Sequence, residues 1–317
     1  MGFADWNDTV NLPRGAESVF SACLYGWALR ELSELCAFRH DESQKKIYDA
    51  WYTEMKKAVL EKAWDGEWFV CDFDEKGEPV GSVKNEYGKV WLNAQTWPVL
   101  SGFVEGDDKG RKALDAVKKY LATEKGIKLS WPPYNGFDPQ KGGVTTYPPG
   151  AKENGGIFLH PNPWAIIAET LLGDGDQAFL YYTRINPAAK NEAIDEYECE
   201  PYCYAQNIIS NDNPNFGLAR NSWLSGTASW MYQASLKYIL GIRPEHEGLR
   251  FDPCIPREWS GFTVERKCRD VMYKITLKNP DRKSKGISSL VIDGKPVNGN
   301  LIPWFSSGVH TVEAVLS

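Results

Sequence analysis

The feature that most restricts the fold of this chain is a change in the spacing of its apolar residues near Gly241. Before this point apolar side chains recur every three or four residues, which is the spacing of an amphipathic helix. After it they alternate with polar ones, as in Met272–Leu277, and such alternation is typical of a strand with one buried face. We therefore predict a mainly α chain with a C-terminal β domain. The boundary is expected near Arg243, so that residues 1–243 and 244–317 form separate domains.

The helical part contains several separate apolar stripes. A helix is expected from about Glu17 to Phe38, and Asp41 with Gln44 resembles a capping box at the start of the next one. Apolar residues at helical spacing then follow in four groups: Ile47, Trp51, Met55 and Ala58; Ala113, Val117, Tyr120 and Leu121; Trp164, Ile167, Ala168 and Leu171; Met231, Ala234 and Tyr238. Helices joined by long connections rich in Gly and Pro are typical of hairpins around a core, with functional loops at one end. This is the pattern expected of an α/α toroid.

Turn and strand signals mark the C-terminal part. Leu290–Ile292 followed by Asp293 and Gly294 predicts a strand that enters a hairpin turn. Val309–Leu316 predicts a closing strand.

Composition excludes several classes of function. A formal net charge of -6 argues against general affinity for nucleic acid or for an anionic membrane surface. The longest early apolar run, Val19–Leu29, has 11 residues, which is too short to span a membrane, and no signal peptide is visible. A cytoplasmic protein is therefore expected.

The cysteines do not form a metal-binding pattern. Seven cysteines cannot all pair, and they show no CxxC spacing, so reduced thiols are expected instead of disulfides. Cys199 and Cys203 have the spacing of a metal pair, but the four histidines lie far from them in sequence. We expect no metal.

Three polar or glycine-rich stretches fall in predicted loops, where catalysis concentrates. The first is Ala4–Thr9, which holds two aspartates and Trp6; taken alone, Asp8 is a turn or capping residue. The second runs from Trp131 to Trp164 and suggests a shaped cavity wall. In it His160 could simply cap a helix, and Glu153 could form a solvated pair with Lys152.

The third stretch is Asn221–Trp230, immediately before the last long helix of this part. Ser225 or Thr227 can serve as its N-cap. Free backbone N–H groups at a helix start also favour an anion, and phosphate is the obvious guest, although every helix needs some N-cap.

These stretches, taken in order, resemble the glycoside phosphorylases grouped with cellobiose phosphorylase and diacetylchitobiose phosphorylase (glycoside hydrolase family 94). The resemblance covers nearly the whole chain. It rests on the segments Ala4–Asp8, Gly15–Val19, Tyr134–Gly136, Pro149–Gly155, His160, Glu200–Gln206 and Ser225–Ala228. It implies a partial (α/α)6 barrel followed by a small β-sandwich.

The resemblance also implies roles for single residues. Asp8 would be the general acid, and Trp6 would line the donor-sugar site. Glu153 and Gln206 match positions that contact sugar hydroxyls. The phosphate site would be formed by His160, Ser225 and Gly226; the family often has Thr where Ser225 stands, so a hydroxyl is retained.

The implied chemistry needs one catalytic carboxyl. An inverting hydrolase uses a second carboxylate to deprotonate water, whereas phosphate is already an anionic nucleophile. Asp8 would protonate the glycosidic oxygen while phosphate attacks from the opposite face, which gives an α-sugar 1-phosphate and a free sugar. No cofactor is implied, and phosphate is a co-substrate. Because Asp8 must be protonated, we expect it to be buried against Trp6.

The substrate is expected to be a disaccharide. Tyr147 falls where a bulky side chain would crowd a 2-acetamido group, so cellobiose is favoured over diacetylchitobiose. Cellodextrins and laminaribiose remain open on the acceptor side.

Two rival interpretations remain. The chain could belong to an α/α-barrel glycoside hydrolase, for which Glu153 is the candidate second carboxylate, or it could be an inactive carbohydrate-binding fragment. Family members have further domains and early barrel helices before the Asp8 motif, so we expect an N-terminal chain or segment to complete the barrel and this chain alone to expose apolar surface. A homodimer is left open.

Overall fold

The computed structural model describes residues 5–317, and its chain divides into two compact units. The first unit extends to Ala168 and resumes from Tyr181 to Trp230. The second combines Glu169–Leu180 with Met231–Ser317.

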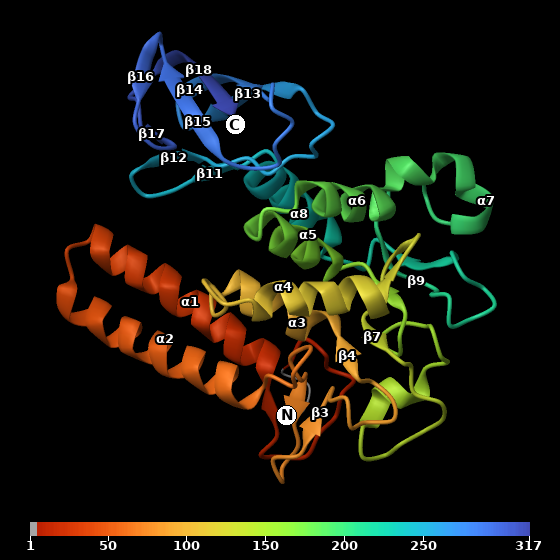
Figure 1. The fold of residues 1–317 in the computed structure, drawn as a ribbon. Helices are drawn as coiled ribbons and strands as arrows, with labels where there is room; N and C mark the ends of the chain where they lie inside the picture. The colour runs from red at the N-terminus through yellow and green to blue at the C-terminus, as the bar shows by residue number, and fades with distance from the viewer. Residues whose placement is uncertain (1–4) are drawn as a thin grey trace. The chain divides into compact units, whose positions relative to one another are not determined.

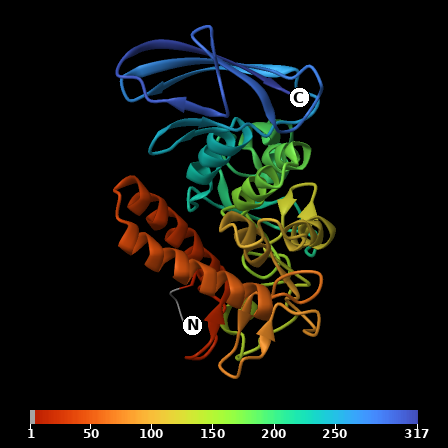
Figure 2. The same ribbon diagram turned by 60° about the vertical axis from the view of Figure 1, so that its left-hand side comes forward.

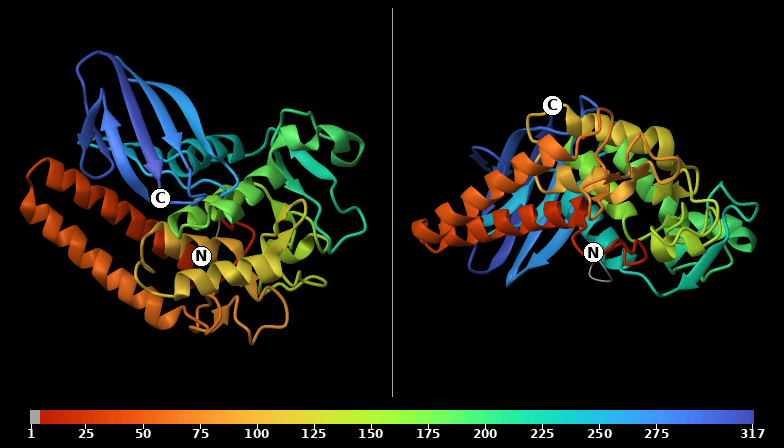
Figure 3. Two further views of the ribbon diagram at one scale, coloured as in Figure 1. Left: turned by 45° about the horizontal axis from the view of Figure 1, so that its top comes forward. Right: turned by 90° about the horizontal axis from the view of Figure 1, so that it is seen from below.

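The first unit begins with a long helical hairpin. Helices α1 (Val19–Phe38) and α2 (Glu42–Lys62) lie side by side (Figures 1 and 3). Ser18 caps α1, since its side chain accepts a hydrogen bond from the amide of Ser21. Asp41 caps α2 by accepting from the amide of Gln44 at 3.1 Å, which confirms the predicted helix start.

Both helices of this hairpin carry exposed apolar side chains. On α1 the exposed side chains include Leu24, Leu32, Leu35 and Phe38, which recur at the spacing of one helix face. On α2, Ile47 and Trp51 were expected in a buried stripe, but they are 43% and 46% exposed. The prediction that this stripe is helical is confirmed. Its first two residues, Ile47 and Trp51, are not buried by any of the described residues.

The remaining helices of this unit are shorter. The predicted stripe from Ala113 to Leu121 forms α4 (Lys109–Ala116) and the π-helix η1 (Val117–Leu121). The stripe from Trp164 lies on α5 (Asn162–Leu171), which continues into the second unit. Helix α3 (Leu92–Leu100) was not predicted; eight of its nine residues are buried, so it has no polar face to create a period. The other helical segments are η2 (Gly142–Thr146), α6 (Gly175–Ile185), η3 (Pro187–Ala193) and α7 (Ile194–Tyr197).

Small sheets connect the loops of the first unit. The strands are β1 (Glu17–Ser18), β2 (Asp72–Phe73) and β3 (Pro79–Val80) in one sheet; β4 (Val90–Trp91) with β7 (Ser130–Trp131); β5 (Ala122–Thr123) with β6 (Gly126–Ile127); and β8 (Ile157–Phe158), β9 (Ala205–Ile208) and β10 (Ala219–Ser222) in order β10-β9-β8. All of these pairs are antiparallel. The last sheet is important for the site because it joins three distant segments.

The second unit carries the predicted β region. After α8 (Thr227–Gln233), which begins in the first unit, and η4 (Ala234–Ile239), one sheet contains β11 (Ile242–Pro244), β12 (Gly248–Phe251) and β17 (Leu301–Pro303). A five-stranded sheet has the order β13-β14-β18-β15-β16, formed by β13 (Gly261–Cys268), β14 (Val271–Lys278), β15 (Ile287–Ile292), β16 (Lys295–Val297) and β18 (Gly308–Leu316), and its long strands are drawn in blue in Figure 2.

The strand predictions in this unit are confirmed. On β14 the side chains of Tyr273, Ile275 and Leu277 are buried and alternate with more exposed neighbours. Asp293 and Gly294 both have positive φ, 49° and 77°, as a tight hairpin turn between β15 and β16 requires. A helix-rich region followed by a multistranded C-terminal region is thus observed; the (α/α)6 barrel, the β-sandwich and the boundary at residue 243 stay predictions.

Candidate active site

The turn that carries Asp8 is anchored by its neighbour Asp5. Asp5 is nearly buried, and its two carboxylate oxygens accept hydrogen bonds from the amide of Asn7 and the hydroxyl of Ser21, both at 2.9 Å. These bonds fasten the turn to the first turn of α1. Asp8 itself is exposed, so the expectation that it is buried against Trp6 is wrong. The two aspartates of one motif therefore differ: Asp5 is structural, and Asp8 faces outward.

Trp6 packs instead against the segment around His160. Its ring lies edge-on to Phe158 at 5.3 Å and to His160 and Trp164 at 5.5 Å each, measured between ring centroids. Trp6 thereby brings the Asp8 turn next to the junction between β8 and α5. Trp6 is half-buried in this position, and its role beside a donor sugar stays a prediction.

Asp8, Tyr147 and Glu153 form an electrostatic group. Burial raises the pKa of Glu153, and the charge of Asp8 raises it further, whereas Lys152 opposes the change. The pKa of Tyr147 is raised by burial first and then by the charges of Glu153 and Asp8. Within the described chain, Oε2 of Glu153 is buried and has no hydrogen-bond partner. Such an atom is prepared to meet a hydroxyl of a ligand.

Asn154 holds the loop that carries this group, and sequence reasoning assigned it no role. The side chain of Asn154 is fully buried and bonds both the amide and the carbonyl of Tyr134, at 2.7 and 2.9 Å. It also donates to the carbonyl of Tyr147 at 2.8 Å. One amide therefore joins two loops that are distant in sequence. Its place beside Glu153 in a polar, glycine-rich motif was the available signal.

The predicted phosphate residues lie together. A side chain added at Gly226 would approach Cε1 of His160 to 3.1 Å, so these two residues are neighbours. The hydroxyl of Ser225 accepts from the amide of Thr227 at 3.1 Å and is also hydrogen-bonded to the Thr227 hydroxyl. Burial lowers the pKa of His160, which favours its neutral form at pH 7. A neutral imidazole can still donate a hydrogen bond to an anion.

Gln206 reaches the same region through the β10-β9-β8 sheet. Its carbonyl accepts from the amide of Leu159, the residue before His160. Its side-chain Oε1 accepts a hydrogen bond from Nδ2 of Asn221 at 2.8 Å. β10 then leads through Trp223 to Ser225, so one small sheet gathers His160, Gln206 and Ser225. Asn221 is a second residue that sequence reasoning did not single out.

The structure thus brings the predicted residues into two linked groups. Asp8, Tyr147 and Glu153 form the acidic group, and His160, Ser225 and Gly226 form the anion group. Trp6 contacts His160 and lies two residues before Asp8, so it joins the anion group to the acidic group. Gln206 lies on β9, next to the anion group.

The cysteines belong to neither of these two groups. All seven cysteines are free thiols, and Sγ of Cys203 accepts a hydrogen bond from the amide of Trp223 at 3.3 Å. In residues 5–317 no group of three or more His, Cys, Asp or Glu side chains is arranged to hold a metal ion. Across the same residues no helix combines the length and the apolar character needed to cross a membrane.

Comparison with known families and proteins gives a consistent result. The family model described as the glycosyl hydrolase 94 superfamily, catalytic domain, matches residues 1–241. Among curated proteins, the chain is 40% identical to an N,N'-diacetylchitobiose phosphorylase of Vibrio furnissii, over 98% of this chain and 39% of that protein. It is 38% identical to the protein of the same name from Vibrio proteolyticus, over 99% of this chain and 39% of the relative. A solabiose phosphorylase of Paenibacillus borealis is 35% identical, over 98% and 41%.

The chain therefore spans about 40% of the length of these curated relatives. Among solved structures, a sialidase shares the fold with a TM-score of 0.58 at 11% identity, over 84% of this chain and 24% of that one.

Proposed function

Because the chain belongs to the glycosyl hydrolase 94 superfamily, we propose that the protein containing it is a glycosyltransferase that splits a β-linked disaccharide with phosphate. The observation that carries the proposal is the joining, through Trp6, of an acidic group around Asp8 to an anion group around His160. A phosphorylase needs both: an acid for the departing sugar and a place for phosphate. The names of the relatives support the same reaction class.

In the proposed reaction, Asp8 gives its proton to the glycosidic oxygen as the bond from that oxygen to the anomeric carbon breaks. A phosphate oxygen attacks the anomeric carbon from the opposite face, so the configuration inverts and an α-sugar 1-phosphate forms. His160 donates a hydrogen bond to phosphate, together with the hydroxyl of Ser225 and the backbone at Gly226. No second catalytic carboxylate and no cofactor are needed.

Glu153 and Gln206 are proposed to hold the donor sugar. The unpaired buried oxygen of Glu153 can accept a hydrogen bond from a sugar hydroxyl. Because Asn221 occupies Oε1 of Gln206, the side-chain Nε2 of Gln206 is left to donate to the sugar.

Cellobiose is proposed as the substrate, with glucose and α-glucose 1-phosphate as products. The argument rests on Tyr147, whose ring stands beside Lys152 with the ammonium 5.4 Å from the ring centroid and whose carbonyl is held by Asn154. A ring restrained in this way would crowd a 2-acetamido group. The names of the two Vibrio relatives favour diacetylchitobiose as the alternative. Comparing kcat/KM for the two disaccharides decides between them, and replacing Tyr147 by Ala should shift the preference towards the acetamido sugar.

A hydrolase is the second candidate, because Glu153 is a carboxyl close enough to Asp8 for their charges to interact. Incubating the active protein with cellobiose in the presence and absence of phosphate separates the two reactions. Phosphorolysis predicts no sugar release without phosphate and an α-sugar 1-phosphate with it, detected by phosphorus and proton NMR. Glucose release that is independent of phosphate would establish hydrolysis instead.

An N-terminal chain or segment is proposed to complete the barrel. The share of the relatives that this chain covers supports this, and so does the exposed apolar face of α1. The 317-residue chain alone is therefore expected to be unstable or inactive, and robust phosphorolysis by it would overturn the proposal. The cytoplasm is proposed as the location.

A further inference from the structure

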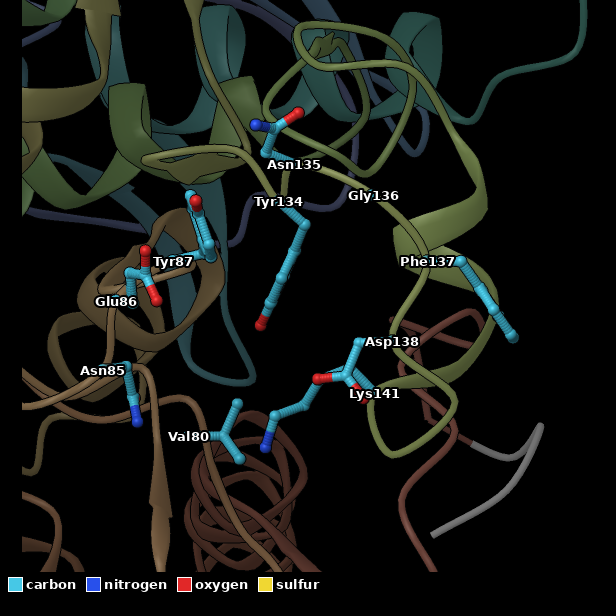
Figure 4. A pocket seen from close by; sticks show the side chains of 10 residues that line it. All are labelled: Val80, Asn85, Glu86, Tyr87, Tyr134, Asn135, Gly136, Phe137, Asp138 and Lys141. Carbon is cyan, nitrogen blue, oxygen red and sulfur yellow. The ribbon is translucent and has the colours of Figure 1, made fainter.

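A cavity of about 350 Å³ opens between the segments around Tyr87 and Tyr134 (Figure 4). Val80, Glu86 and Tyr87 line one wall, and Tyr134, Asn135, Asp138 and Lys141 line the other. Neither the acidic group nor the anion group contributes a residue to it. Its volume falls at the small end of the range for ligand pockets, about 300–1,000 Å³, which suits one small molecule.

The two walls are held in place by backbone contacts. The amide of Gly88 donates to the carbonyl of Pro132 at 2.7 Å. Gly88 has a φ of +58°, and any side chain there would approach the hydroxyl of Tyr134 to 2.6 Å. Tyr134 is in turn bonded at both backbone atoms to Asn154. The pocket is thus formed before any ligand arrives, which lowers the entropic cost of binding.

The lining combines aromatic faces with hydrogen-bonding side chains. The rings of Tyr87 and Tyr134 lie 6.2 Å apart and are inclined by 44°. Glu86 and Asn135, one from each wall, both act on the hydroxyl of Tyr87: Glu86 raises its pKa and Asn135 opposes the rise. Aromatic faces match the apolar faces of a sugar ring, and carboxylate and amide groups match its hydroxyls.

The charges in the pocket disfavour an anion. Glu86 and Asp138 are acidic, and Lys141 is the basic residue of the lining. The charge of Lys141 also acts on the buried carboxyl of Asp72, where it opposes the rise in pKa that burial causes. A neutral ligand rich in hydroxyl groups fits this balance better than a phosphate ester or a nucleic acid.

We propose that this pocket is a second saccharide site, which binds one neutral hexose ring through Tyr87 and Asn135, while Tyr134, which is 6% exposed, forms part of the wall behind them. The site concerns binding alone and does not require the chemistry proposed for Asp8. Asn154 bonds the backbone of Tyr134 in the pocket wall and directly follows Glu153 in the chain. The wall of this pocket and the acidic group are therefore held by the same loop.

The test is a titration with cellobiose, in the absence of phosphate, of the valine-methyl-labelled active protein that contains this chain, followed by NMR. Val80 lines the pocket, and its methyl signals can be assigned with Val80→Ile. The signals of Val80 should move and saturate in the wild type and equally in Asp8→Asn. In Tyr87→Ala combined with Asn135→Ala the apparent affinity should fall at least about tenfold, and Tyr87→Phe should retain part of it. The other valine signals verify that each variant is folded.

Three results would overturn the proposal. The Val80 signals could stay in place at cellobiose concentrations that move valines near the Asp8 turn, such as Val144. The Tyr87→Ala and Asn135→Ala variant could respond like the wild type. Inorganic phosphate could move the Val80 signals at lower concentration than cellobiose, which would make the pocket an anion site.

Discussion

Asn221 donates a hydrogen bond from Nδ2 to Oε1 of Gln206 at 2.8 Å. Asn221 has a φ of 56°, a left-handed conformation that asparagine adopts more readily than most residues. This bond determines which end of the Gln206 amide is free. Strained backbone next to a candidate site is a frequent feature of functional regions.

Replacing Asn221 by Asp should weaken disaccharide binding. The substitution keeps the size and tolerates the positive φ, but it presents an acceptor where Gln206 needs a donor, so the Gln206 amide turns over. We expect KM for the disaccharide to rise about tenfold, equivalent to one lost hydrogen bond of about 1.4 kcal/mol, with KM for phosphate unchanged. Asn221→Gly, which suits the backbone and removes the donor without reversing it, should have a smaller effect. Equal kinetics in all three proteins would contradict the orientation role.

Replacing Asp8 by Asn should remove the proton donor while leaving the sugar site intact. In the active protein kcat for cellobiose phosphorolysis should fall roughly 100- to 10,000-fold. A β-glycosyl fluoride needs no protonation of its leaving group, so Asp8→Asn should use this donor nearly as well as the wild type does. If Asp8→Asn loses both reactions to the same extent, Asp8 is a binding residue and not the acid.

Glu153→Gln is the matched comparison. Because Glu153 is proposed to bind a hydroxyl, its loss should raise KM for the sugar and affect the fluoride and the disaccharide alike. A hydrolase would behave differently, since a variant without the second carboxylate would lose water attack in particular. Comparing the disaccharide with the β-glycosyl fluoride therefore distinguishes the role of Asp8 as an acid from the role of Glu153 in binding.

His160 is expected to act on phosphate as a neutral hydrogen-bond donor, because burial lowers its pKa. His160→Ala should raise KM for phosphate about tenfold or more, whereas His160→Asn, which retains a neutral N–H donor, should restore part of the loss. Gly226→Ala adds a methyl 3.1 Å from Cε1 of His160 and should displace the ring, with the same kinetic signature. An unaltered phosphate KM in His160→Ala would remove this residue from the phosphate site.

Local signals predicted much of the fold. The cap at Asp41 and the turn at Asp293 and Gly294 are encoded within a few residues, so the sequence was sufficient for both. Helix α3 was missed because it is buried on nearly every side, which removes the amphipathic period on which the prediction depends.

The site was only partly predictable for a related reason. Asp5 and Asp8 are chemically equivalent in the sequence, and only the bond from Ser21 to Asp5 separates their roles. Asn154 and Asn221 act on residues 7 to 20 positions away, and such pairings depend on the three-dimensional arrangement of the loops. Family resemblance could identify residues in direct contact with ligands, but not the side chains that position them.

Asp72 should make the stability of the chain fall as pH rises towards neutrality. It is 1% exposed, and its Oδ2 has no hydrogen-bond partner among the described residues. Burial raises its pKa from 3.8 to about 7, Asp5 adds to the increase, and a hydrogen bond with Cys71 opposes it. Since the folded-state pKa is raised, the stabilising contribution is complete below about pH 4 and is lost between about pH 4 and 7.

Asp72→Asn should therefore be more stable than the wild type above pH 7, by on the order of 4 kcal/mol, and the gain should shrink towards pH 4. Urea unfolding of the active protein that contains this chain, followed at pH 4.5 and pH 8, measures this difference. Asp74→Asn, two residues further along the same hairpin, is the control variant. The pKa of Asp74 is lowered, chiefly by the hydrogen bond from the amide of Glu78, so its contribution is present at neutral pH and is lost on acidification. The two variants should thus shift stability in opposite directions at pH 8. If Asp72→Asn is less stable than the wild type at that pH, an interaction of the buried carboxylate outweighs the free-energy cost of burying its charge.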